Sequence, residues 1–266
     1  MARPGRRAAR AALRATGGPG QVAHSAFVWS ASFAWMGGVA ASSAALARLL
    51  PWEHVHRLVA SPGMAACLSF TLSDVEVVRH PDFDPSRPAV FCQNHVNLMD
   101  AHAACAAIPH TFCGLMNWWH FKVPFYGQLM ALADGIAVPA DRSGRYAKIA
   151  EQARDRAERG VSILVFPEGH RTLDGRVGEF RRGTFHMARE AGLPVVPLAV
   201  HGMYGMMHKG SPLVRPGKIT ILVGPQVETE GLSPEGVPAL ARGVRDVVAR
   251  FVETGEVPDD EIARIT

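Results

Sequence analysis

The sequence predicts an α/β fold, in which a mostly parallel sheet is covered by helices on both faces and is preceded by an N-terminal membrane-associated helical element. From residue 74 onward, short apolar segments alternate with helical patterns, which is typical of strands buried on both faces of a parallel sheet. Polar clusters directly follow several of these segments, as expected where strands deliver side chains to the carboxyl edge of a sheet. Residues 22–47 contain no Asp, Glu, Lys or Arg, which sets the beginning of the chain apart.

The positive charge of the chain is concentrated at its start. The 266 residues carry a net charge of +4, and five arginines lie within the first 14 residues, far ahead of the first acidic residue, Glu53. The remaining 23 basic residues face 24 acidic ones, so the body of the protein is close to neutral. A nucleic-acid-binding protein would carry its surplus on the folded domain, so we exclude that class. A basic tail beside an apolar stretch suits anionic lipid headgroups, although a solvated disordered tail is also compatible with the pattern.

The charge and hydropathy patterns divide the chain into four parts: a basic disordered tail (1–21), a membrane-associated helical element (22–72), an α/β domain (73–255) and a C-terminal tail (256–266). The apolar run 22–47 has 26 residues, against the ~20 that a helix needs to span a bilayer. It predicts a spanning helix, a helix hairpin in one leaflet, or a cleaved signal peptide. Basic residues on both flanks, together with Pro51 and the Ser61-Pro62-Gly63 break, favour a hairpin with both flanks on the cytosolic face.

Alternation of apolar segments, helical periodicity and breakers predicts the elements of the α/β domain. Gly160, for example, follows a charged amphipathic segment as its C-cap. The expected strands are 74–79, 89–92, 111–116, 135–139, 161–166, 195–200 and 219–223, and the expected helices are 100–108, 128–133, 146–159, 180–192 and 238–253. The strongly aromatic segment 117–126 has two interpretations: core aromatics under a loop, or side chains that line an apolar channel or enter the headgroup layer.

The segment Val90 to Asp100 is the first candidate for chemistry. An apolar strand ends in Gln93-Asn94-His95, and Asp100 follows His95 by five positions. Imidazole can accept a proton near neutral pH, and a carboxylate on its other nitrogen fixes the tautomer and stabilises the imidazolium. The two side chains can meet if His95 precedes a helix that begins near Asp100. Two other interpretations are a helix cap and a metal site, and we expect no metal because no further Cys or His pair has a usual ligand spacing.

Two more polar clusters follow predicted strands, and we expect them to face the same cleft as His95. Asp141-Arg142 follows the strand at 135–139, and Glu168 to Thr172 follows the strand at 161–166. Two guanidinium groups, from Arg142 and Arg171, can hold a phosphate by charge-assisted hydrogen bonds. Glu168 can orient an arginine or accept a hydrogen bond from a substrate hydroxyl.

These motifs resemble those of the glycerolipid acyltransferases, the 1-acylglycerol-3-phosphate acyltransferase family. The segment N-H-V-N-L-M-D is similar to the family's first block, N-H-x-x-x-x-D, and F-P-E-G-H-R-T is similar to its third, F-P-E-G-T-R-S. The segments G-I-A-V-P-A-D-R and L-P-V-V-P-L-A-V resemble the second and fourth blocks. All four occur in family order across about residues 90 to 200, and F-K-V-P-F-Y-G falls where the family has a similar I-P-F-F-G segment.

The resemblance implies a transferase that moves a fatty acyl group from acyl-CoA or acyl carrier protein, as co-substrate and without a further cofactor, to a lysophospholipid hydroxyl. It implies His95 as the general base and Asp100 as its partner. It places Asn94, Arg142, Glu168, Gly169 and Arg171 around the substrate, and the catalytic domain on the cytoplasmic face of a membrane.

This sequence departs from the family pattern around the expected acceptor site. His170 replaces a small hydroxyl residue, Asn97 replaces a common serine, and the usual lysines before the I-P-F-F-G segment are missing. The resemblance implies 1-acylglycerol-3-phosphate as the acceptor, and these departures leave lyso-ornithine lipid, lysocardiolipin or a glycolipid as alternatives. A membrane-associated lipid hydrolase is a further hypothesis, and so is a lipid-binding protein without activity, although the intact His95 and Asp100 argue against the latter.

Overall fold

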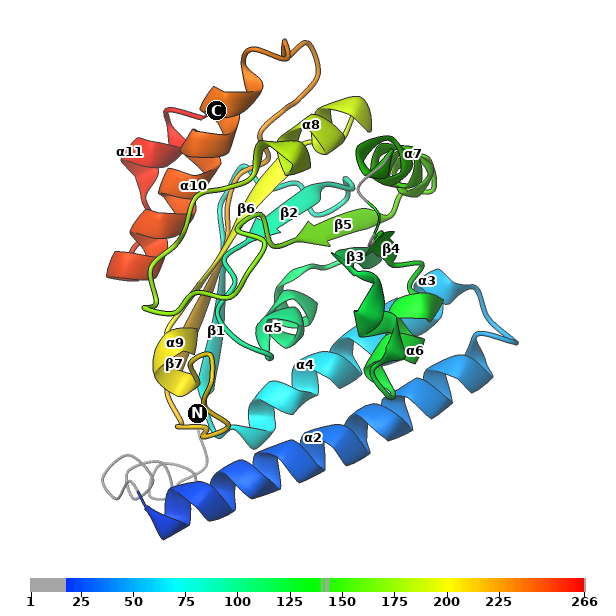
Figure 1. The fold of residues 1–266 in the computed structure, drawn as a ribbon, viewed down its shortest axis with the longest axis vertical. Coiled ribbons are helices and arrows are strands. Elements are labelled where there is room, and N and C mark those ends of the chain that lie inside the picture. Colours follow the sequence, from blue (N-terminus) through cyan, green and yellow to red (C-terminus); the bar gives the residue numbers. More distant parts are fainter. Residues whose placement is uncertain (1–17, 140, 142–143, 266) are drawn as a thin grey trace.

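The computed structural model describes residues 18–139, 141 and 144–265, and these residues form a seven-stranded sheet in the order β1-β7-β6-β2-β5-β3-β4 (Figure 1). Every described strand pair is parallel except β6 and β7, which run antiparallel. The predicted α/β class and the mostly parallel sheet are thus confirmed. The strands are β1 (Asp74–Arg79), β2 (Val90–Gln93), β3 (Phe112–Asn117), β4 (Ile136–Val138), β5 (Ser162–Val165), β6 (Val195–His201) and β7 (Lys218–Val223).

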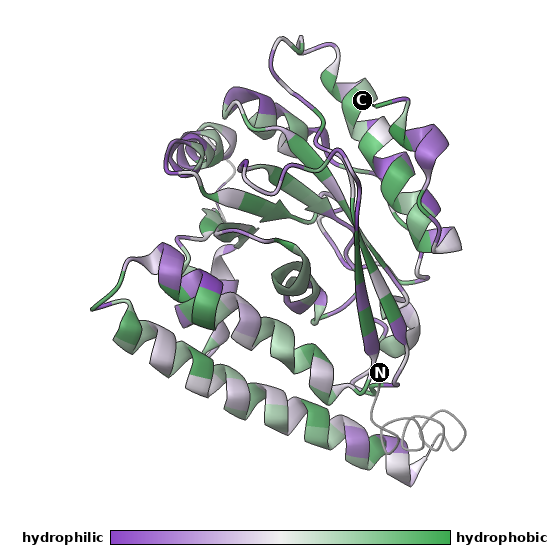
Figure 2. Cartoon of the chain, turned by 180° about the vertical axis from the view of Figure 1, so that it is seen from behind, coloured by the Kyte–Doolittle hydropathy of each residue, from purple (hydrophilic) through white to green (hydrophobic). Residues whose placement is uncertain are grey.

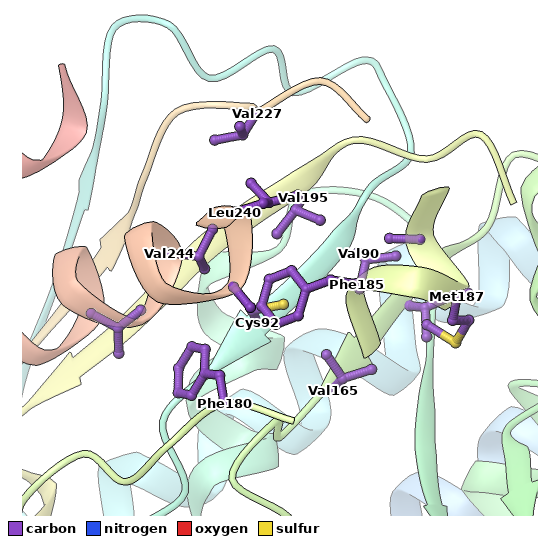
Figure 3. Packing of buried hydrophobic residues seen from close by; sticks show 14 of the residues in the cluster. Val90, Cys92, Val165, Phe180, Phe185, Met187, Val195, Val227, Leu240 and Val244 are labelled. Carbon is purple, nitrogen blue, oxygen red and sulfur yellow. The ribbon is translucent and has the colours of Figure 1, made fainter. Parts of the chain in front are cut away.

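Helices cover both faces of the sheet, as predicted. One face is packed by α7 (Arg145–Glu158), α8 (Arg182–Glu190) and α10 (Val237–Thr254), and the other by α5 (Asp100–Ala107) and the N-terminal helices (Figure 1). The core on the first face includes Phe185 of α8, which lies among Val90, Cys92 and Val195 of the central strands (Figure 3). Because β2, β5 and β6 are buried on both faces, most of their residues are apolar, as the sequence shows.

The N-terminal element is a helical hairpin that packs on the domain. The long helix α2 (Pro19–Leu46) lies alongside α4 (Ser61–Phe70), with α3 (Trp52–Val55) and the π-helical turn η1 (His56–Ala60) between them in sequence. Trp35 Nε1 donates to the carbonyl of Gly63 at 2.7 Å, and a Cβ at Gly63 would lie 2.7 Å from the Val39 side chain, so the two helices approach closely.

The hairpin does not provide a bilayer-spanning helix. Over the described ranges, none of the helices is both long and apolar enough to cross a membrane. The moderate hydropathy of α2 is visible in Figure 2, where green and near-white residues are mixed along its length. Buried polar side chains explain part of this composition, because Gln21, Ser25, Ser32 and Ser43 lie on the covered side of α2. Of the predicted basic tail, residues 1–17 lie outside the described residues, while Pro19 to Gln21 already belong to α2.

The remaining elements lie close to the predicted positions. The turn η2 (Trp118–Lys122) and α6 (Tyr126–Leu132) follow β3, and α6 begins two residues before the predicted helix. Two short helices were not predicted: α9 (Met203–Met206), directly after β6, and α11 (Asp259–Ile262), inside the segment expected to be a tail. Ile262 is buried, and the Ile265 side chain occupies the space that a Cβ at Gly243 of α10 would need, so this segment packs back on the domain.

Helix α5 buries a histidine that makes stability depend on pH. His102 is 5% exposed, neither of its ring nitrogens has a hydrogen-bond partner among the described residues, and burial lowers its pKa to about 4. Its folded pKa is below the unfolded value, so its contribution is fully present above about pH 6.5 and is lost as the pH falls toward 4. Between pH 7 and pH 5 the free energy of unfolding of the wild type should fall. We expect this fall to be about 2 kcal/mol smaller in His102→Leu, because leucine cannot take up a proton.

The measurement is the free energy of unfolding in urea at pH 7 and pH 5, for the wild type, His102→Leu and the exposed control His208→Gln. The carboxylates and the other buried histidine, His56, are common to all three proteins, so the difference isolates His102. An equal loss of stability in His102→Leu and in the wild type would contradict the prediction.

Candidate active site

His95 lies at the carboxyl end of β2, beside the ends of β5 and β6. The residue before it fixes this end of the strand. Asn94 is 2% exposed, its Oδ1 accepts from the Val200 amide at 2.8 Å, and its Nδ2 donates to the Val200 carbonyl at 3.2 Å. Both ends of the side chain are therefore bound to β6. In the described residues the Asn94 amide binds the backbone of β6, and its substrate contact stays a prediction.

The predicted histidine–carboxylate contact is present. His95 Nδ1 lies 2.7 Å from Asp100 Oδ2, and the same oxygen accepts from the amides of Val96 at 2.6 Å and Asn97 at 3.0 Å. Asp100 is the first residue of α5 and is 1% exposed. Burial raises its pKa, while the hydrogen bonds from His95, Val96 and Asn97 oppose that rise and favour the carboxylate. The helix N-terminus adds a further favourable field for a negative charge.

The His95 ring is held in one orientation and keeps one nitrogen available. It stacks on Phe166 with ring centroids 4.2 Å apart and an interplanar angle of 22°, and its side chain is 25% exposed. Because Nδ1 is directed to Asp100, Nε2 is the nitrogen that can exchange a proton with a substrate, and none of the described residues hydrogen-bonds to it. This is the geometry that a general base requires.

Glu168 positions the backbone around the histidine. Its Oε1 accepts from the His95 amide at 2.7 Å and its Oε2 accepts from the Gly178 amide at 2.8 Å. Burial raises the pKa of this carboxyl, and the two amides oppose the rise. The sequence suggested that Glu168 orients an arginine or accepts from a substrate hydroxyl. Among the described residues, each carboxylate oxygen accepts from a backbone amide and Glu168 forms no ion pair with an arginine. Its role toward a substrate stays a prediction.

The loop after Glu168 brings cationic side chains to the same edge of the sheet. Gly169 has a φ of +73°, which favours glycine, and the Arg181 guanidinium lies close to it, since a Cβ there would be 2.4 Å from its Cζ. Arg171 is half-buried, and Thr172 donates its amide to the His95 carbonyl at 2.8 Å. Arg142, the predicted second phosphate ligand, lies outside the described residues. The structure therefore places Arg171 near His95, and the phosphate-binding roles of Arg142, Gly169 and Arg171 stay predictions.

The aromatic segment 117–126 is largely exposed. Trp118 is 44% exposed, Trp119 is 50% exposed and Phe125 is 41% exposed, so their interpretation as core residues is wrong. The Phe125 ring lies against α2, because a Cβ at Gly37 would be 3.4 Å from it. The segment thus runs between α2 and the carboxyl edge of the sheet.

Sequence reasoning missed three contributors to the site: Phe166, which stacks on His95; Arg181, which lies against Gly169; and His120 of η2. The positive charges of His95 and Arg171 both act on His120. A cleft of about 310 Å³ also lies beyond Val96, between the 174–176 loop and the ends of β6 and α10. It includes none of the predicted site residues. No group of three or more His, Cys, Asp or Glu residues in the described ranges is arranged to hold a metal ion.

Comparisons with known proteins agree with this arrangement. The acyltransferase family model matches residues 71–201. A 1-acyl-sn-glycerol-3-phosphate acyltransferase from Limnanthes douglasii is 31% identical over 173 residues, which are 64% of this chain and 61% of the relative. The 1-acyl-sn-glycerol-3-phosphate acyltransferase alpha of Homo sapiens is 32% identical over 172 residues, again 64% and 61% of the two chains. The chain thus spans about three fifths of the length of these relatives.

A solved structure has the same fold. The crystal structure of the 1-acyl-sn-glycerophosphate (LPA) acyltransferase PlsC from Thermotoga maritima superposes with a TM-score of 0.75 at 23% identity. The alignment covers 88% of this chain and 95% of that one.

Proposed function

Because the chain belongs to the glycerolipid acyltransferase family, we propose that it transfers a fatty acyl group from a thioester to the hydroxyl of a lysophospholipid, with 1-acylglycerol-3-phosphate as the acceptor and phosphatidic acid as the product. The single observation that carries the proposal is the 2.7 Å contact between His95 Nδ1 and Asp100 Oδ2 at the carboxyl edge of the sheet. The acyl donor is acyl-CoA or acyl carrier protein, used as a co-substrate.

In this mechanism, His95 Nε2 removes the proton of the acceptor hydroxyl as its oxygen bonds to the thioester carbonyl carbon. The carbon–sulfur bond then breaks, the thiolate leaves with the electron pair, and the imidazolium returns the proton to the thiolate. Asp100 stabilises the imidazolium between these two steps and fixes the tautomer before them. Glu168 keeps the His95 backbone in place through its amide. Arg142 and Arg171 hold the acceptor phosphate in this proposal.

The acceptor and the product are lipids, so we propose that the hairpin and the aromatic segment dock on a membrane, with the catalytic domain on its cytoplasmic face. Large apolar side chains are exposed along these elements, which supports docking at the surface of a bilayer. Arg48 and Arg57 are exposed beside them and suit anionic headgroups. The exposed apolar residues are Val22, Phe27, Phe33 and Trp35 of α2, Leu49, Leu50 and Leu58 of the hairpin turn, and Trp118, Trp119 and Phe125.

The test is an incubation of the purified full chain with acyl-CoA and a panel of lysolipids, with products identified by mass and thiol release followed over time. The proposal predicts thiol release that depends on an acceptor, and phosphatidic acid as the main product. Thiol release that is equally fast without acceptor, with free fatty acid as product, would indicate a hydrolase instead. Lysolipid binding without any thiol release would indicate a lipid-binding protein.

A further inference from the structure

His120 lies at the same edge of the sheet as the histidine–carboxylate pair, but on a different element. It belongs to η2, directly after β3, and β3 pairs with β5 in parallel register through Gly114 and Leu164. The loop that carries Glu168 and Arg171 therefore lies between the η2 side and His95. His120 is half-buried, in a segment whose tryptophans are exposed.

The His120 ring is held by its neighbours in a defined orientation. Its Nδ1 lies 3.1 Å from the carbonyl of Asn117 and donates to it, so Nε2 is the nitrogen available to a ligand. The ring stacks on Trp119, with centroids 3.7 Å apart and an interplanar angle of 23°. Lys122, the cation on the same turn, lies 4.6 Å above the Trp118 ring and is engaged there.

The charges around His120 favour its neutral form. Burial lowers the pKa of His120, the Asn117 carbonyl opposes this, and His95 when it is protonated and the Arg171 guanidinium lower the pKa further. These two groups reach it from the ends of β2 and β5, whereas Lys122 is the cation on its own element. A neutral imidazole beside cations can accept a hydrogen bond at Nε2 and take up a proton only when an anion arrives.

We propose that His120 determines acceptor specificity, by selecting a lysolipid with a terminal phosphomonoester over one with a phosphodiester headgroup. This inference rests on the proposed function and names the acceptor class of the same site. A phosphomonoester has a second ionisation near pH 6, so it can share a proton with His120 Nε2 in either direction. A phosphodiester has no second proton to share and carries one negative charge. It can bind His120 strongly only after the ring has taken a proton from water, which Arg171 and His95 disfavour.

The experiment measures binding of 1-oleoyl lysophosphatidic acid and of lysophosphatidylglycerol to the full-length protein in neutral detergent micelles, by calorimetry, with KM and kcat measured alongside. We expect His120→Ala to weaken binding of the monoester about tenfold, to change binding of the diester less than twofold, and to leave kcat nearly unchanged. The exposed control His208→Ala should match the wild type for both lipids. Equal losses for the two lipids, or no loss for either, would overturn the proposal.

A second variant, His120→Gln, tests whether the effect of His120→Ala arises from a loss of structure. In His120→Gln the amide can donate a hydrogen bond but cannot exchange a proton, so it should lose the preference for the monoester as His120→Ala does. Wild-type discrimination in His120→Gln would overturn the proposal. Binding is measured without turnover, so a wild type that binds the monoester through His120 but forms no product would refute acyl transfer and not the role of His120.

Discussion

Replacing His95 with alanine is expected to lower the turnover number of acyl transfer by about 10²- to 10⁴-fold, because the acceptor hydroxyl then has no base to take its proton. The fold should persist, since the His95 side chain is 25% exposed and the contacts that hold the loop use its backbone amide and carbonyl. The measurement is the initial rate of thiol release at saturating acyl-CoA and lysophosphatidic acid.

The matched control for this variant is His208→Ala, which removes an exposed histidine that follows α9 in the sequence. Thermal unfolding of both variants shows whether a loss of rate reflects a loss of structure. A well-folded His95→Ala protein that turns over at the wild-type rate would contradict the general-base role.

The second large effect is expected at Asp100. Two substitutions there should lower turnover equally, but only one of them should lower stability strongly. Asp100→Ala removes the acceptor of three hydrogen bonds and leaves the amides of Val96 and Asn97 without a partner in a buried site. We expect it to cost about 2–4 kcal/mol in the free energy of unfolding, and to lower turnover at least a hundredfold.

Asp100→Asn is the informative partner of this variant. Its amide oxygen can still accept from the backbone, so stability should fall by less than about 1 kcal/mol. It cannot provide the negative charge that stabilises an imidazolium, so turnover should remain as low as in Asp100→Ala. Turnover near the wild-type level in Asp100→Asn would show that Asp100 only caps α5. Urea unfolding and the thiol-release assay measure the two effects.

Much of this architecture could be predicted from the sequence because buried parallel strands leave a strong signal. All seven predicted strands are present within a few residues of their expected bounds. The contact of His95 with Asp100 was predictable as well, since the strand end and helix start are local features that bring positions i and i+5 together. The antiparallel pairing of β6 with β7 was not predicted, because the residue pattern of a buried apolar strand does not indicate its direction relative to a neighbouring strand.

The parts of the site that could not be predicted depend on contacts between distant segments. Asn94 and Glu168 look like ligand-binding residues in sequence, yet their partners are the backbone groups of Val200, His95 and Gly178. Sequence patterns do not identify such backbone partners, because any residue can supply an amide or a carbonyl. His120 was missed for a related reason: its approach to His95 and Arg171 depends on how η2 folds after β3.

The N-terminal element shows a third kind of difference. An uncharged run of 26 residues satisfied the length criterion for a spanning helix, but its Ser, Gly and Ala content keeps its hydropathy moderate. In the structure, α2 packs along α4, with Trp35 bound to the Gly63 carbonyl, while Phe27, Phe33 and Trp35 remain partly exposed. The length of an apolar run was therefore less informative than the placement of its small polar residues.

The most direct test of the proposed chemistry measures thiol release and ester formation in the same reaction, with isotope-labelled acyl-CoA and lysophosphatidic acid. The wild type is expected to form one labelled ester for each thiol released, only when the acceptor is present, and His95→Ala is expected to form essentially none. Thiol release without ester formation in the wild type, or undiminished ester formation in His95→Ala, would contradict the general-base mechanism.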